Sequence, residues 1–213
     1  VFERAEIRDA MAYFRLIRSE DDDLAFERVV NQPKRGVGAT TLQKLQAIAR
    51  GDGRSLSTIC RMVLQTDEVK GPAKRGLTSF MNHLDMWRDK HHAGESHTEL
   101  AEQILEESGY TDMLRADRSP QAATRLDNLK ELVSAMGQFD SLAAFLEHVQ
   151  LVMDTTVDGG NEDEVQILTL HAAKGLEWPL VFLPGWEDGL FPSQRSMDES
   201  GLKGSLSVQT LHR

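Results

Sequence analysis

Apolar residues recur at steps of three and four along the first 155 residues, and this spacing limits the possible folds more than any other feature of the sequence. Side chains three and four positions apart lie on one face of an α-helix, so each stripe predicts an amphipathic helix packed against a core. The first stripe is formed by Ile7, Ala10, Met11, Phe14 and Ile17. Similar stripes occupy residues 42–49, 56–63, 77–87, 126–136 and 142–152. The sequence therefore predicts a mainly α-helical domain.

Residues that favour helix ends separate several of these stripes. Ser96-His97-Thr98-Glu99 has the spacing of a capping box, and Gly109 suits the position just beyond the C-terminus of the helix that this box opens. Gly137 is expected to end a later helix, and Asp140 or Ser141 to cap the one after it. These signals strengthen the prediction of several separate helices.

The composition changes near residue 155. Residues 155–164, TTVDGGNEDE, are polar and acidic and contain two glycines, as expected of a linker. Beyond them, residues 165–170 (VQILTL) and 180–183 (LVFL) are short apolar runs typical of buried β-strands. Two strands after a long series of helices predict a second structural unit. We expect a helical unit at residues 1–161 and a small α/β segment at residues 162–213.

Charge and composition exclude several classes of protein. The chain has 24 Lys and Arg against 34 Asp and Glu, a formal net charge of -10, so its whole surface cannot be a general phosphate binder, although a local basic region is compatible. Hydrophobic residues make up 40%, which excludes a disordered tail. The first residues, VFER, do not resemble a signal peptide, and no run of about 18 apolar residues occurs, so we expect neither secretion nor association with a membrane. The single cysteine, Cys60, fits a reducing, cytoplasmic location and the helix core between Ile59 and Val63.

The two ends of the chain suggest a piece of a longer or processed protein. VFER at the N-terminus leads directly into a helical pattern without an initiator Met. At the other end, residues 201–213 lack clear periodicity. We therefore expect the activity of a parent protein to differ from that of this chain alone.

A glycine-rich turn at residues 33–41, PKRGVGATT, is the first candidate site. Its two glycines allow a tight hairpin with positive φ, and either threonine can cap the helix that follows. Free N–H groups at a helix N-terminus, a hydroxyl and two adjacent cations predict a phosphate site without base contacts, although an ordinary corner between helices would have the same pattern. The candidate residues are Lys34, Arg35, Gly36, Gly38, Thr40 and Thr41.

A second candidate site follows the first expected strand, at residues 169–177, TLHAAKGLE. Ligands of open α/β sheets bind beyond the carboxyl ends of the strands, and small residues there let the backbone approach a phosphate. The segment offers a hydroxyl, a ring nitrogen, a cation and a carboxylate as ligand contacts, but a plain strand-to-loop turn remains the alternative. The candidate residues are Thr169, His171, Lys174, Gly175 and Glu177.

These segments resemble the superfamily 1A DNA helicases of the UvrD/PcrA/Rep type. Residues 165–196, VQILTLHAAKGLEWPLVFLPGWEDGLFPSQRS, are similar to motif V and its surroundings in that family. Residues 2–15 (FERAEIRDAMAYFR) and 25–38 (AFERVVNQPKRGVG) are similar to the start of its 2B subdomain. RecB- and AddA-type helicase–nucleases share the KGLEW form of motif V, but RGVG and the length of the helical region favour the UvrD branch.

The resemblance implies a layout and a set of roles. Residues 1–161 would be the helical 2B subdomain, with a helix–hairpin–helix element that contacts duplex DNA, and Val37 stands where the family has Ile. Residues 162–213 would be the second segment of the RecA-like 2A subdomain, which is incomplete here. The implied single-stranded DNA contacts are Thr169 and His171, and the implied ATP contacts are Lys174, Gly175 and Glu177.

The resemblance also implies an ATP-dependent 3′-to-5′ DNA helicase that uses ATP and Mg²⁺ in the intact parent. The implied partners are a junction of single-stranded and duplex DNA, subdomains 1A, 1B and the rest of 2A, and, as candidates, repair proteins. The sequence contains no Walker A motif, no acidic Walker B strand precedes residue 162, and residues 203–213 depart from motif VI, so we expect no ATP hydrolysis by this chain alone. The alternative is a non-enzymatic DNA-docking or autoinhibitory protein-interaction module.

Other chemically distinctive residues are more simply explained by structure. His91, His92 and His97 lack a completing carboxylate or cysteine and suggest a polar loop, so we expect no metal site. Residues 20–23, EDDD, are interrupted as a calcium loop by the apolar residues that follow and fit a solvated helix start. Trp178 and Trp186 are expected to pack at a sheet more often than to stack on bases.

Overall fold

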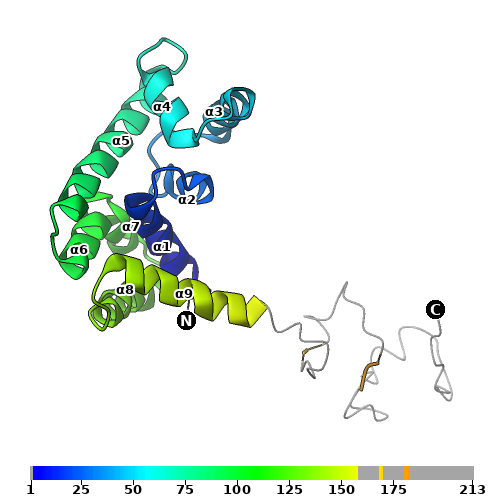
Figure 1. The fold of residues 1–213 in the computed structure, drawn as a ribbon, viewed down its shortest axis with the longest axis vertical. Coiled ribbons are helices and arrows are strands. Elements are labelled where there is room, and N and C mark those ends of the chain that lie inside the picture. Colours follow the sequence, from blue (N-terminus) through cyan, green and yellow to red (C-terminus); the bar gives the residue numbers. More distant parts are fainter. Residues whose placement is uncertain (1, 158–167, 170–179, 183–213) are drawn as a thin grey trace. The chain divides into compact units, whose positions relative to one another are not determined.

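A computed structural model describes residues 2–157, 168–169 and 180–182, and within these residues nine helices follow one another and no strand is present (Figure 1). The helices are α1 (Ala5–Arg18), α2 (Asp23–Val29), α3 (Ala39–Asp52), α4 (Leu56–Leu64), α5 (Gly71–His92), α6 (His97–Glu107), α7 (Tyr110–Ala116), α8 (Ala122–Met136) and α9 (Leu142–Val157). Contacts divide the chain into two units, Val1–Glu162 and Asp163–Arg213, and all nine helices lie in the first. The prediction of a mainly helical fold is confirmed.

The second unit is described at five positions. Leu168, Thr169 and residues 180–182 have no regular secondary structure there and are exposed, with Phe182 at 80%. The expected strands at 165–170 and 180–183 were predicted to be buried, and these five residues do not meet that expectation. The remaining residues of both runs lie outside the described part, so the small α/β segment stays a prediction.

Helix α1 is the central element of the helical unit. It contacts α2, α5, α6, α8 and α9, and Figure 1 shows it surrounded by these helices. Its apolar stripe is buried throughout, as predicted. Tyr13 meets the edges of Phe80 and Trp87 of α5, with ring centroids 6.5 and 6.2 Å apart. Such edge contacts add specific attraction to the burial of large rings, so they hold α5 against α1.

Two carboxylates also face the interior from α1. Asp9 accepts hydrogen bonds from Arg28 Nε at 2.8 Å and from the Tyr110 hydroxyl at 2.7 Å. Glu6 accepts one from Asn128 Nδ2 at 2.6 Å. Burial, and then the hydrogen bond to Asp9, raise the pKa of Tyr110, so its hydroxyl remains a donor. A buried carboxylate is costly without partners, and these contacts join α1 to α2, α7 and α8.

Several predictions about helix ends and burial have clear outcomes. Gly109 has φ 81 after the end of α6, as expected, and Ser141 caps α9 by accepting from Ala144 N at 3.1 Å. The prediction of a capping box is wrong, because the Ser96 hydroxyl lies 3.0 Å from the Thr98 hydroxyl and accepts no backbone N–H. Val152 is 38% exposed instead of buried, because the last turns of α9 extend beyond the other helices (Figure 1).

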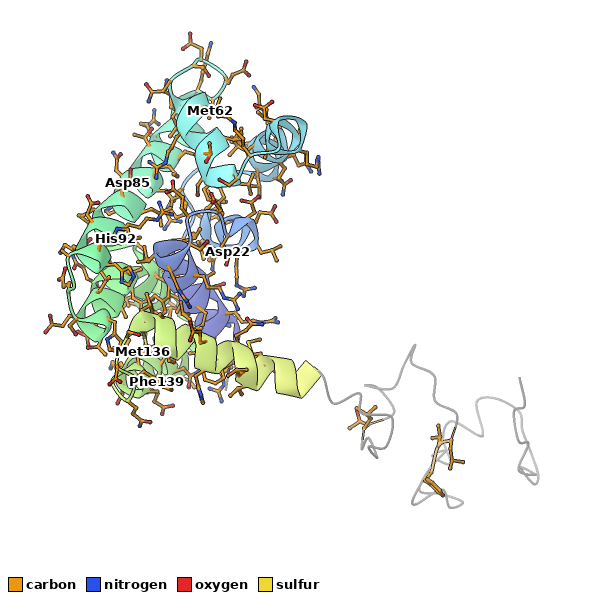
Figure 2. All side chains as sticks on the ribbon, viewed as in Figure 1. Asp22, Met62, Asp85, His92, Met136 and Phe139 are labelled. Atoms are coloured by element: carbon orange, nitrogen blue, oxygen red, sulfur yellow. The ribbon has the colours of Figure 1, made fainter. Side chains whose placement is uncertain are left out.

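Helices α3 and α4 and the start of α5 form one end of the helical unit (Figure 1). A charged network ties this end to the centre: Arg61 of α4 donates to Asp85 of α5 at 2.8 Å and to Glu20 at 2.9 Å. Figure 2 places Asp85 on α5 between His92 and the end marked by Met62. Cys60 is fully buried in α4, as predicted, and burial raises its pKa to about 12. Among the described helices, none is long and apolar enough to cross a membrane.

Candidate nucleic-acid interface

Residues 30–38 join α2 to α3 in a tight turn, and residues 39–41 are the first residues of α3. Gly36 has φ 79, a left-handed conformation that glycine adopts without strain. The side chain of Asn31 holds the turn from inside, since its Oδ1 accepts from Arg35 N at 2.8 Å and from Val37 N at 3.2 Å. Val37 is 2% exposed and anchors the tip in the core. The hairpin expected from the two glycines is therefore present, with the positive φ at Gly36.

The start of α3 differs from the prediction in its capping residue. Gly38 has φ -78 and is the N-cap of α3, with no side-chain cap, so the expectation of a positive φ there was wrong. Thr40 and Thr41 lie in the first turn instead of at the cap, so the prediction that one of them caps the helix was also wrong. Glycine has no side chain to accept an N–H, which leaves the first turn without a protein acceptor.

The uncapped first turn of α3 is suited to an anion. The first helical hydrogen bond runs from Leu42 N to Gly38 O, so the amides of Ala39, Thr40 and Thr41 have no acceptor among the described residues. The first turn contains no acidic residue. Helix N-termini carry a partial positive charge and free N–H groups, the arrangement that binds phosphate oxygens.

The predicted phosphate contact of Arg35 stays a prediction, but its guanidinium already has several partners within the protein. Its guanidinium points into the protein, where it donates to the carbonyl oxygens of Val29 (2.7 Å), Val30 (3.2 Å), Pro33 (3.2 Å) and Ser108 (3.1 Å), and to the Tyr13 hydroxyl. It also lies 5.0 Å from the centre of the Phe80 ring. The physical reason is that the carbonyl oxygens at the end of α2 have few backbone donors, and a forked cation satisfies them better than water can.

Close backbone contact with α5 fixes the hairpin further. A Cβ built at Gly76 of α5 would lie 1.9 Å from the carbonyl oxygen of Arg35, a distance that no side chain tolerates. A Cβ at Gly36 would lie 3.0 Å from Pro72 Cβ. The hairpin therefore rests on α5 through two glycines, and its outer face is held in one position.

The cations at this end of the molecule are mostly exposed. Residues 30–76 contain nine Lys and Arg against three Asp and Glu, while the rest of the chain has 15 against 31. Lys34 is exposed close to Gly36 and forms no ion pair with a described residue, and its predicted contact with duplex DNA stays a prediction. Lys70, Lys74 and Arg75 also lie in this basic stretch of the chain.

A cleft of about 200 Å³ lies beside the hairpin. Its lining includes Arg35, Gly76 and Ser79 on one side and Glu107 on another. Burial would raise the pKa of Glu107, but hydrogen bonds from Gln103 and from Trp87 Nε1 (2.9 Å) outweigh it and lower the pKa. The cleft thus offers a fixed carboxylate and backbone, and it is part of the structure that supports the hairpin.

The histidines at 91, 92 and 97 and the acidic residues 20–23 were considered above as metal and calcium sites. No group of three or more His, Cys, Asp or Glu side chains there is arranged to hold a metal. Asp22 caps α2 by accepting from Ala25 N at 3.0 Å, which confirms a helix start at residues 20–23. His91 and His92 end α5 and were wrongly predicted as a loop.

The second candidate site falls almost entirely outside the described residues. Thr169 is described and exposed. His171, Lys174, Gly175 and Glu177 lie outside the described part, as do Trp178 and Trp186. The roles that the resemblance implies for these residues therefore stay predictions.

Comparison with known proteins identifies the family of the chain. A family model described as the UvrD-like helicase C-terminal domain matches residues 1–205. The chain belongs to this family. It is 40% identical over 204 residues to "DNA helicase II" of Rickettsia typhi and 40% identical over 209 residues to "DNA helicase II" of Escherichia coli K12. It is 39% identical over 212 residues to "ATP-dependent DNA helicase PcrA" of Bacillus subtilis 168.

The matches cover most of this chain and a minor part of each relative. They span 95%, 94% and 93% of the chain, but 31%, 29% and 28% of the respective relatives. The chain therefore spans about 30% of the length of the relatives it matches. The family is established by this UvrD-like domain, and the activity of the whole protein is a separate question.

Proposed function

We propose that this chain is the part of an ATP-dependent DNA helicase that holds duplex DNA. The observation that carries the proposal is the uncapped first turn of α3, held beside exposed Lys34 by a rigid hairpin in a UvrD-like helicase domain. Backbone amides and a lysine recognise phosphate oxygens and do not read bases. The contact would therefore hold duplex DNA of any sequence while the motor moves.

In the intact protein, the helical unit would act as the 2B subdomain and residues 162–213 as the second segment of 2A. Thr169 and His171 would contact the single-stranded DNA backbone. Lys174, Gly175 and Glu177 would face ATP, with the Glu177 carboxylate reaching the ribose. ATP and Mg²⁺ would bind between two RecA-like subdomains, and their cycle would move the protein 3′ to 5′ along one strand. Residues that transfer the phosphoryl group would come from outside this chain.

Salt-dependent binding tests the duplex contact. Each phosphate neutralised by a protein cation contributes about -0.9 to the slope of log K against log salt for duplex DNA. Lys34→Ala in the 213-residue chain should weaken binding to a short duplex and make this slope shallower by about 0.9. The matched control is Arg118→Ala, which removes an exposed cation between α7 and α8 that has no ion pair within residues 2–157. Equal slopes for the two variants would refute the contact at the hairpin.

The nucleotide role needs the full-length protein. Glu177→Ala should raise KM for ATP in the DNA-stimulated ATPase reaction, because it removes the expected ribose contact. Glu177→Gln is the conservative companion, since the amide oxygen retains one hydrogen-bond acceptor. An unchanged KM in the alanine variant would remove the proposed role of Glu177.

A further inference from the structure

The cleft beside the hairpin lies where α5 meets the end of α6, two helices that run side by side (Figure 1). It is lined by residues of α5, by the last residues of the α6 segment and by Arg35. Its volume of about 200 Å³ is smaller than the roughly 300–1,000 Å³ of typical small-molecule sites. A cleft of this size fits one side chain better than a whole cofactor or metabolite.

The N–H donors of the cleft are already in use. Arg35 donates to the carbonyl oxygens of Val29 at 2.7 Å and Ser108 at 3.1 Å. Trp87 Nε1 donates to the Glu107 carboxylate at 2.9 Å. A phosphate or carboxylate in the cleft would have to compete with these contacts, because it can only accept. An anionic occupant is therefore disfavoured.

Two acceptors of the cleft remain available. The pKa of Glu107 is lowered, so the group is a carboxylate, and it accepts one hydrogen bond from Trp87 and one from Gln103, out of about four that its oxygens can take. His83 Nδ1 lies 3.0 Å from the carbonyl oxygen of Ser79 and must donate to it, since a carbonyl only accepts. Nε2 of the neutral ring is then an acceptor, and it has no hydrogen-bond partner within residues 2–157. The His83 ring is held by stacking on Trp87, with centroids 5.3 Å apart.

The helix that supplies Glu107 is strongly acidic. Helix α6 contains four glutamates and neither Lys nor Arg. Glu99 and Glu102 are exposed and form no ion pair within residues 2–157, whereas Glu106 is paired with Arg115 at 2.6 Å. Complementary charge steers association and suppresses wrong partners. A protein that approaches over α6 is therefore favoured if its contacting segment is basic.

We propose that this cleft is a docking site for a protein partner and receives one arginine side chain from a basic segment of that partner. The planar guanidinium presents five N–H donors in a fork, which suits a carboxylate and a neighbouring ring nitrogen better than the compact ammonium of lysine does. Charge-assisted hydrogen bonds of this kind are strong, and arginine is one of the residues that most often anchor protein interfaces. The inference is independent of the duplex contact, because Glu107 and His83 take no part in that contact.

NMR titration of the 213-residue chain tests the docking site, with the indole N–H of Trp87 as the reporter because it donates to Glu107. The chain has three tryptophans, so Trp178→Phe with Trp186→Phe leaves this single indole signal. The probe is N-acetylarginine amide, and its matched control is N-acetylcitrulline amide, which has nearly the same shape without the charge. We expect a saturable shift of the Trp87 signal with the arginine probe and roughly ten-fold weaker binding of the citrulline probe.

Two variants test the acceptors separately. Glu107→Gln removes the charge but keeps an oxygen that can accept from Trp87, and it should weaken binding of the arginine probe roughly ten-fold. Its matched control is Glu102→Gln, which removes an exposed carboxylate of α6 outside the cleft and should change the affinity far less. His83→Phe keeps a ring against Trp87 but removes Nε2, so it should also weaken binding. Circular dichroism checks that each variant is folded.

Each outcome bears on the proposal directly. Binding of the arginine probe that persists in Glu102→Gln and is weakened in both Glu107→Gln and His83→Phe would support it. Equal binding of the arginine and citrulline probes, or equal affinities of Glu107→Gln and Glu102→Gln, would overturn it. A lysine probe, N-α-acetyllysine amide, that binds as tightly as the arginine probe would overturn the choice of arginine.

Discussion

The guanidinium of Arg35 points into the protein, so we expect this residue to contribute to the stability of the fold. The sequence alone had suggested a contact with phosphate. Arg35→Met keeps an unbranched side chain over Phe80 but removes donors from four carbonyl oxygens and the Tyr13 hydroxyl. The Val29 oxygen keeps a second donor, Gln32 N at 3.1 Å. The three other carbonyl oxygens are left without a protein donor among the described residues.

The magnitude follows from those three oxygens. An acceptor that loses its partner costs about 1–3 kcal/mol, and the lower value applies here because the site is half-buried and water can enter. The free energy of unfolding should therefore fall by about 3 kcal/mol. For a domain of this size, Tm would fall by about 6–12 °C. Arg35→Lys should recover a minor part, because a single ammonium cannot serve acceptors in so many directions.

Urea unfolding followed by circular dichroism measures this effect. Lys34→Met is the matched control, since Lys34 is the adjacent, exposed cation and its loss should change stability by less than about 0.5 kcal/mol. An Arg35→Met midpoint equal to that of Lys34→Met would refute the reasoning. If the same variant also reduced the salt dependence of duplex binding, Arg35 would contact phosphate after all.

Three further predictions concern close packing, pH and thiol access. Gly76→Ala should lower the free energy of unfolding by about 1–3 kcal/mol, because the new Cβ would lie 1.9 Å from the carbonyl oxygen of Arg35. The control is Gly51→Ala, which has open space around it and should raise the free energy of unfolding by up to about 1 kcal/mol. Stabilisation by both in urea unfolding would contradict the contact. The hydrogen bond from Arg61 lowers the pKa of Asp85 against the opposing effect of burial, so its contribution is present above about pH 4 and is lost as the pH falls below that value. In Asp85→Asn, the free energy of unfolding lost between neutral and acid pH should be smaller by less than about 1 kcal/mol. An unchanged dependence of stability on pH would contradict the Arg61–Asp85 pair. Cys60 should react with a thiol reagent only after unfolding, and rapid labelling of the folded chain would contradict its burial.

The helices could be predicted from the sequence because their apolar stripes each face one core. The stripe of α1 holds at every position, including Phe14, which is fully buried. Val152 fails because periodicity shows which face of a helix is apolar but not how far the covering helices extend. The capping box at residues 96–99 fails because the Ser96 hydroxyl pairs with the neighbouring Thr98 hydroxyl, a contact that the motif does not describe.

The candidate site could be located from the sequence, but the roles of its side chains could not. Gly36 predicts a tight turn, because few other residues adopt its positive φ without strain. Whether Arg35 points outward or inward depends on the carbonyls at the end of α2 and on Ser108, which is 73 residues away in the chain. The contacts of Pro72 and Gly76 with the hairpin bring α5 to the site, and no local pattern contains them.

Amide hydrogen exchange of the 213-residue chain with and without duplex DNA tests the central claim most directly. The amides of Ala39, Thr40 and Thr41 have no acceptor among the described residues, so they should exchange rapidly in the free chain. Saturating duplex DNA should slow their exchange, because phosphate oxygens would accept from them. Slowed exchange confined to α6–α9, with the start of α3 unchanged, would contradict the account.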